Sequence, residues 1–422
     1  MNYITNINKS IHFWASLLVF SLLILAMTHF TGETVILLPG RYYRLLLECF
    51  SFSILFMYLT HPKVSKRIIF LKFPLICFFI LFLVFLLRFP DDQEYFTNSI
   101  KFIVSTFLMF AFFFAVACRR WNIKDMRIIS YGAFILISLT FMKWVLDGMP
   151  LSNYDAYGIN PNGVGFIVLI IFCILTIGFL LGKIIGRIWF IITIIMSTVL
   201  LFVTSSRAAL LFGLILSITY WIWPKISHNR SRLIIMGTFI FLVCNIFPYI
   251  YIYLYTLGID LENILVLNKA LSSRYKEWLI PLSFFIEKPF WGWGIHAEVG
   301  FLGEGVYQTA HNSYIELAIR TGIVGVLLYL LFILSILYLL WEGHKDTICR
   351  FCGAFLIAVL IYQVFERIMI VATDVDSLMI YFILGIGLSR VRDLKYQQSL
   401  SSFSSFIEDK KIGIKHAHTN LT

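Results

Sequence analysis

Long apolar runs separated by short polar gaps dominate the pattern of hydrophobic and polar positions along this chain. A helix that crosses a membrane needs ~20 consecutive, mostly apolar residues. About twelve runs meet that length. The sequence therefore predicts an all-α polytopic membrane protein, with transmembrane helices near residues 12–30, 42–60, 68–88, 98–117, 128–147, 162–182, 187–204, 207–223, 233–255, 323–341, 352–372 and 376–389.

One long stretch, residues 256–322, is too polar to lie in a membrane, and we expect it to form a large loop between spans nine and ten. Within it, Leu271 to Lys288 has the pattern of an amphipathic helix. Trp291-Gly292-Trp293-Gly294 predicts a turn. A second helix is expected to begin near His311-Asn312, and Thr321-Gly322 to form the hinge that leads into span ten.

The distribution of charge predicts how these spans are oriented. The chain is 60% hydrophobic and 14% charged, with 42 Phe, a balance that excludes a soluble domain. Its net charge of +11 could indicate nucleic-acid binding in a soluble protein. Here Lys and Arg concentrate in alternate gaps between apolar runs, which is the positive-inside pattern. Both termini are therefore predicted to be cytoplasmic, and the large loop to face outward, into the periplasm in a Gram-negative bacterium.

The remaining composition favours a single membrane domain over residues 1–422. The segment from about 396 to 422 is polar and Ser-rich at its start, and we expect it to be a disordered cytoplasmic tail. All seven Cys fall in predicted helices or predicted cytoplasmic gaps and none lies in the large loop, so no disulfide is expected. Cys349 and Cys352 form a lone CxxC without a second pair, which does not indicate a metal site.

Three residues on the predicted outer face have side chains suited to one reaction. Arg207 lies in the tight connection between spans seven and eight, Arg274 begins the loop helix, and His311 begins the second loop helix. Two guanidinium groups suit a diphosphate, because their planar forks bind phosphate oxygens in pairs. An imidazole can accept a proton near neutral pH. Equally, Arg207 could be an anchor to lipid headgroups, Arg274 a partner of Glu277, and His311 a helix-entry residue.

Further polar residues are candidates for substrate contacts. His296 follows the Gly-rich turn and competes with His311 as the base. Asn312, Tyr314 and Arg320 lie on the second loop helix, where Arg320 would be either an anion contact or a headgroup anchor. Glu366 and Arg367 fall within predicted span eleven and are costly there if they face lipid. We expect them to face the bundle interior or a cavity, although adjacent helical residues need not form a pair.

The missing motifs restrict the donor of such a reaction. The sequence contains no Walker loop, no GxGxxG before a strand and no HExxH. An outward-facing site also has no access to ATP or nucleotide sugars. The donor must arrive already activated, and a glycan linked to a polyprenyl diphosphate meets that need.

These motifs in this order resemble the O-antigen ligase and polymerase superfamily. The resemblance covers about residues 200–330, while size and predicted span layout agree over the rest of the chain. Its motifs are Thr204-Ser205-Ser206-Arg207-Ala208-Ala209-Leu210-Leu211, Ser273-Arg274-Tyr275, Glu287-Lys288-Pro289-Phe290, Gly292-Trp293-Gly294-Ile295-His296, His311-Asn312-Ser313-Tyr314 and Gly322-Ile323-Val324-Gly325.

The resemblance implies an inverting inner-membrane glycosyltransferase with a periplasmic site and no metal or nucleotide cofactor. Arg207 and Arg274 match the arginines that bind the diphosphate of undecaprenyl-diphosphate-linked O-antigen in the ligases. His311 matches the histidine that activates the sugar hydroxyl of the lipid A–core acceptor. The Trp-Gly-Trp-Gly-Ile-His turn also occurs in polymerases, so an O-antigen polymerase is the alternative. A non-enzymatic transporter of lipid-linked glycans is the alternative from another class.

Overall fold

The structure is a computed structural model, and it describes residues 69–86, 93–155, 160–182, 186–258, 274–295, 297, 310–371 and 375–419. In this part of the chain every regular element is helical. The elements are α4 (Lys72–Leu86), α5 (Gln93–Cys118), α6 (Ile123–Leu146), α7 (Pro161–Gly182), α8 (Arg187–Val203), α9 (Arg207–Ile226), α10 (Arg230–Thr256), α12 (Arg274–Glu287), α14 (Ser313–Glu342), α15 (Thr347–Tyr362), the 3-10 turn η2 (Met369–Val371) and α16 (Val375–Thr419).

Six of the described helices, namely α6, α7, α9, α10, α14 and the Ser99–Cys118 part of α5, are long and apolar enough to cross a membrane. Three shorter helices, α4, α8 and α15, are also apolar. These helices show a multi-pass membrane protein. The predicted count of about twelve spans remains a prediction, since the first two expected spans lie outside the described residues.

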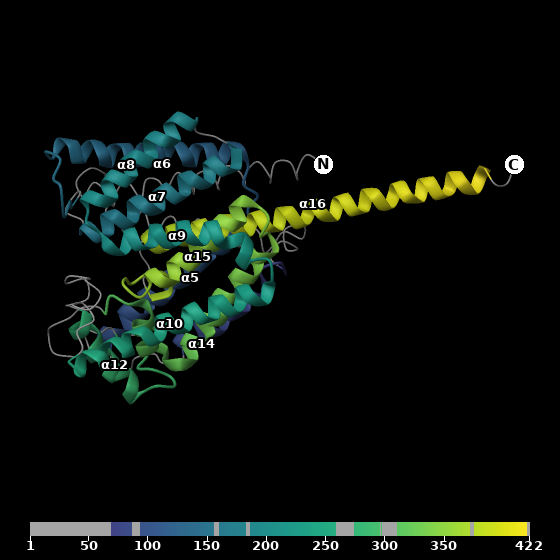
Figure 1. Cartoon of the computed structure of the whole chain (residues 1–422). Helices are drawn as coiled ribbons and strands as arrows, with labels where there is room; N and C mark the ends of the chain where they lie inside the picture. Colours follow the sequence, from purple (N-terminus) through teal and green to yellow (C-terminus); the bar gives the residue numbers. More distant parts are fainter. Residues whose placement is uncertain are drawn as a thin grey trace.

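The helices form two groups on either side of a shared middle layer (Figure 1). Helices α6, α7 and α8 pack on one another, and α10, α12 and α14 form the second group. Between the groups, α9 packs along α15, and α16 packs against α5 and α15. The aromatic rings of Phe166, Phe212 and Tyr362 join α7, α9 and α15, with Phe166 stacked on Tyr362 at 4.0 Å between centroids.

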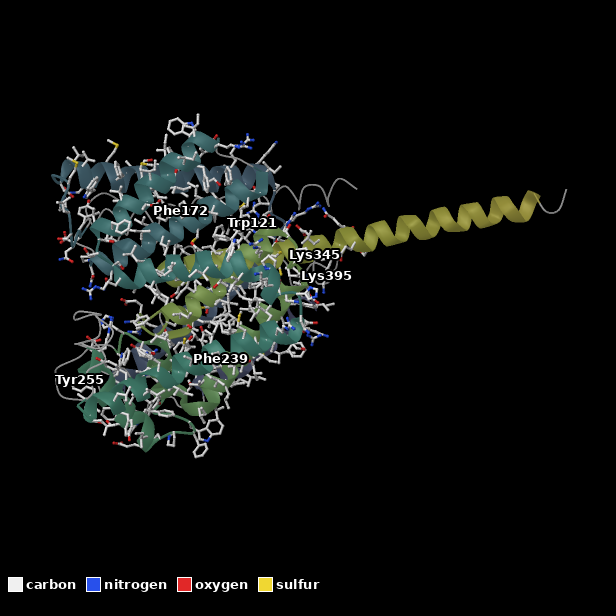
Figure 2. All side chains as sticks on the ribbon, viewed as in Figure 1. Trp121, Phe172, Phe239, Tyr255, Lys345 and Lys395 are labelled. Carbon is white, nitrogen blue, oxygen red and sulfur yellow. The ribbon has the colours of Figure 1, made fainter. Side chains whose placement is uncertain are left out.

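The bundle has two chemically different ends. One end, which we call the basic end, carries Arg119, Arg120, Lys345, Arg390 and Lys395; Figure 2 shows Lys345 and Lys395 near the base of the protruding part of α16. The opposite end, the loop end, carries α12 and Tyr255.

The start of α9 also lies at the loop end. Helix α9 runs antiparallel to α15, because Phe212 near its start contacts Tyr362, the last residue of α15, while Tyr220 near its end contacts Phe351. Arg207, the first residue of α9, is therefore at the same end of the bundle as the segment that follows α15.

Two expected boundaries differ from the structure. Predicted span eleven, 352–372, ends as helix α15 at Tyr362, and residues 363–371 fold into turns and η2. Hydropathy does not distinguish these turns from a membrane helix, because Val364, Ile368 and Met369 are apolar but buried against protein. Beyond residue 396, where we expected disorder, α16 continues to Thr419; no proline follows Val375 to stop it.

Candidate active site

The helix α14 at the loop end has a break in its backbone. Helix α14 is interrupted at Gly322, whose φ of 64° and ψ of −166° are not helical. The break frees backbone groups that must find other partners. The preceding turn supplies them: Trp293 N donates to Ile319 O at 2.7 Å, and Gly294 N donates to Arg320 O at 3.0 Å. The hinge expected at Thr321-Gly322 is therefore confirmed.

Two glycines allow this turn to approach the hinge. A Cβ on Gly292 would lie 2.4 Å from Ile319 O, and a Cβ on Gly322 would lie 2.2 Å from Phe290 O. Both residues also have positive φ, which glycine adopts at little cost. On the other side of the break, Ile323 N donates to Pro289 O at 2.8 Å. Backbone hydrogen bonds thus hold the turn against α14. A side chain at Gly292 or Gly322 would prevent this close approach.

The start of α14 positions His311. Asn312 is the N-cap, and its Oδ1 accepts hydrogen bonds from Tyr314 N at 2.9 Å and Ile315 N at 3.1 Å. His311 precedes this cap with a positive φ of 44°, which is uncommon for a residue other than glycine. Its side chain remains 48% exposed. The cap is buried and the imidazole is accessible, as a base that meets a substrate requires.

Arg274, His311 and Glu366 form one cluster at the loop end. Arg274 Nη1 lies 2.7 Å from Glu277 Oε2, which is the local pairing left open by the sequence. Its Nη2 donates to Phe365 O at 3.1 Å and lies 4.0 Å from Glu366 Oε1. The other carboxylate oxygen, Glu366 Oε2, lies 3.5 Å from His311 Nδ1. One carboxylate therefore links the predicted base to one of the predicted diphosphate-binding cations.

A buried serine fixes the segment that carries Glu366. Ser313 Oγ donates to Glu366 O at 2.9 Å and accepts from Ile368 N at 2.9 Å, and Ser313 N donates to Gln363 O. Gln363 Nε2 in turn donates to Tyr329 Oη at 2.7 Å. Ser313 directly follows the His311-Asn312 pair. It therefore holds the segment of Glu366 close to His311.

Glu366 and Arg367 have different partners, although both lie beyond the end of α15 and not within a helical span as expected. Arg367 Nε lies 3.0 Å from Glu316 Oε2, and the same oxygen is 3.5 Å from Arg320 Nη2. Arg320 is fully buried, with its guanidinium 4.5 Å from the centre of the Phe102 ring. This burial differs from a headgroup anchor. Glu316, Arg320 and Arg367 form a second group of charges, in which Glu316 and Arg320 are buried and Arg367 is partly exposed.

The other possible substrate contacts are placed less favourably. Asn312 and Tyr314 are buried, and Tyr314 Oη donates to Leu360 O at 2.7 Å. Their contacts in the structure are within the protein. His296 lies outside the described residues. Among the residues that are described, no group of three or more His, Cys, Asp or Glu side chains is arranged to hold a metal ion.

Arg207 occupies the first turn of α9 at the loop end. Ser206 is the N-cap and accepts from Ala209 N, and its Oγ reaches Asn162 O at the start of α7 at 3.5 Å. Ser205 has a positive φ of 55° and its Oγ accepts from Asn153 N. A cation in the first turn opposes the helix dipole, and a bound anion would offset that cost. The exposed Arg207 therefore suits an anionic ligand.

Unusual backbone geometry also concentrates at this end. The described non-glycine residues with positive φ are Met149, Asn153, Ser205, His311 and Met369. They lie in the connections at the loop end, whereas the described connections at the basic end have none. Such conformations persist only where the surroundings impose them, and they are frequent at functional sites.

A comparison with protein families agrees with this geometry. Residues 191–330 match a family model described as O-antigen ligase. This segment, about a third of the chain, is similar to the O-antigen ligase family. The match covers Arg207, Arg274 and His311, and it confirms the resemblance drawn from the motifs. No curated protein matched the chain.

Glu366 lies outside the matched O-antigen ligase segment, and sequence reasoning did not assign it a role in the site. It was singled out only as a charge within an apolar run. Its partner His311 is 55 residues earlier in the chain. Only the packing of the 363–371 segment on the start of α14 brings the two together.

Proposed function

We propose that the protein is an O-antigen ligase. It transfers O-antigen polysaccharide from undecaprenyl diphosphate to the lipid A–core oligosaccharide at the periplasmic face of the bacterial inner membrane. The observation that supports this function best is the exposed His311 joined through Glu366 to Arg274 at the loop end. A base and a diphosphate-binding cation are then adjacent within a segment that the O-antigen ligase family model largely covers.

In the proposed reaction, His311 accepts the proton of an acceptor sugar hydroxyl. The hydroxyl oxygen attacks the anomeric carbon of the donor, and the bond from that carbon to the diphosphate oxygen breaks. Arg207 and Arg274 stabilise the negative charge that develops on the leaving undecaprenyl diphosphate. Attack from the side opposite the leaving group inverts the anomeric centre. These two guanidinium groups perform the charge stabilisation, so the reaction is proposed to be independent of metal.

The charge pattern supports the proposed orientation. Lys345, Lys395 and Arg390 at the basic end would lie in the cytoplasm, together with the protruding part of α16. The loop end would then lie at the outer surface. Both substrates are lipid-linked, so a site at the end of the bundle places the reacting groups near the membrane surface.

Replacement of His311 tests the assigned chemistry. A general base contributes about 10²- to 10⁴-fold to a rate. We expect His311→Ala, expressed at the wild-type level in the membrane, to lose O-antigen transfer by a factor in that range. The matched control is His228→Ala, which changes an exposed histidine in the connection after α9 at the basic end and should transfer normally. Full activity of His311→Ala would refute the base role and favour a transporter.

A further inference from the structure

We propose that Glu366 is a positioning residue that orients His311 for proton abstraction. This inference rests on the proposed function and adds a residue to it. The two oxygens of Glu366 point to different groups, with Oε2 3.5 Å from His311 Nδ1 and Oε1 4.0 Å from Arg274 Nη2. A carboxylate in this place can hold the His311 imidazole in one orientation, as a third group orients the base in other catalytic sites.

The contact determines which imidazole nitrogen accepts the proton. When Nδ1 carries hydrogen and faces Glu366, the lone pair of Nε2 is left to accept a proton from the acceptor hydroxyl. After the transfer the imidazole is positively charged, and the adjacent carboxylate stabilises it. At 3.5 Å the contact is slightly longer than an ordinary hydrogen bond, and contacts of this kind shorten when substrate binds.

The surroundings of Glu366 suit positioning better than substrate binding. Its backbone oxygen is held by Ser313 Oγ, and the neighbouring Phe365 O by Arg274 Nη2. The side chain is 20% exposed, compared with 48% for His311. A negatively charged carboxylate would also repel the donor diphosphate. The accessible group of the pair is the imidazole, and the more enclosed group supports it.

The arrangement also explains a carboxylate in an otherwise apolar segment. Residues around Glu366 such as Val364, Ile368 and Met369 are buried, and an isolated charge among them would be costly. Arg274 offsets part of that cost. Arg274 already pairs with Glu277 at 2.7 Å, so a second carboxylate is not needed to hold it. The contact to His311 supplies the remaining reason for Glu366.

The test is a double-mutant cycle with the full-length protein reconstituted in liposomes. The substrates are lipid-linked polymer and lipid A–core extracted from a strain that lacks the protein. We expect Glu366→Gln to lower kcat by about 10²-fold or more, within the range of a general base, with the KM for the lipid-linked donor unchanged. Glu366→Asp, which restores the charge, should recover part of the rate.

The decisive measurement is the combined variant. If Glu366 acts through His311, the double variant His311→Ala/Glu366→Gln will be no slower than His311→Ala, because residues acting as a unit are not additive. The matched control is Glu342→Gln, which removes a carboxylate paired with Lys395 at the basic end and should leave kcat unchanged.

The outcomes separate the two proposals. Additive losses in the double variant, or a Glu366→Gln variant with wild-type kcat beside an inactive His311→Ala, would overturn the positioning role alone. A fully active His311→Ala would instead overturn the proposed function. Loss of folded protein in Glu366→Gln but not in Glu366→Asp, with kcat per folded molecule unchanged, would also overturn the positioning role.

Discussion

Substitution of Gly322 by alanine tests whether the break in α14 depends on close backbone packing around this residue. A Cβ at this position would lie 2.2 Å from Phe290 O, 2.3 Å from Phe290 C and 2.5 Å from Trp291 N. All three neighbours are backbone atoms, so no side chain can rotate away. The backbone conformation, φ 64° and ψ −166°, lies in a region that is essentially restricted to glycine.

The expected cost follows from these two effects. A residue forced into a sparsely populated backbone region costs about 1–3 kcal/mol. Overpacking of a tight contact adds about 1–3 kcal/mol. Together they predict a destabilisation of about 2–6 kcal/mol. The alternative is that the turn at Trp291–Gly294 separates from α14, which breaks the bonds to Ile319 O and Arg320 O.

Gly258 provides a matched control. Its φ is +75°, but a Cβ there would meet nothing within 4 Å. Gly258→Ala should therefore cost only the backbone term, about 1–2 kcal/mol. We would measure the half-life of thermal inactivation in detergent for both variants. Each difference of about 1.4 kcal/mol in the barrier changes such a rate about tenfold. Equal half-lives for Gly322→Ala and Gly258→Ala would refute the close packing described here.

Three further predictions concern charged residues. Arg207→Lys should lower O-antigen transfer by at least about tenfold, since an ammonium cannot reproduce the paired guanidinium contacts. The control is Arg230→Lys at the start of α10. Wild-type activity of Arg207→Lys would contradict the diphosphate contact. Glu316→Gln should destabilise the protein by about 3–5 kcal/mol, because it removes the carboxylate beside the buried Arg320; thermal inactivation at the wild-type rate would contradict this. Lys143 hydrogen-bonds to Asp147 and lowers the pKa of that carboxyl, so the pair stabilises the fold above the ordinary Asp pKa and loses this effect as pH falls through the lowered value. The melting temperatures of wild type and Asp147→Asn should therefore converge as the pH falls. A difference in melting temperature that grows as the pH falls would contradict this role of the pair.

Local patterns in the sequence predicted the loop end well. The Asn312 cap depends only on the residues that follow it, and the hinge at Gly322 depends on a residue that can adopt positive φ. The loop helix also begins within three residues of its expected start, at Arg274. Helix α7 begins at Pro161, one residue before the start of the span expected at 162–182.

Contacts between distant segments could not be predicted. Residues 363–371 read as a continuation of an apolar helix, because hydropathy does not distinguish burial in lipid from burial in protein. Their turns depend on Ser313 and on Ser377, whose Oγ accepts from Met369 N. Arg320 read as a surface residue, yet it is buried with Glu316 and Phe102. These positions depend on the packing of the helices, which a single sequence does not show.

The most direct test of the proposed function uses a strain from which the protein has been deleted. Its lipopolysaccharide is separated on a gel, and lipid-linked polymer is stained in parallel. A ligase predicts that lipid A–core loses O-antigen while long polymer accumulates on the lipid carrier, and that the wild-type gene restores transfer but the His311→Ala gene does not. Lipid A–core that carries a single repeat without a ladder would contradict the ligase and identify a polymerase instead.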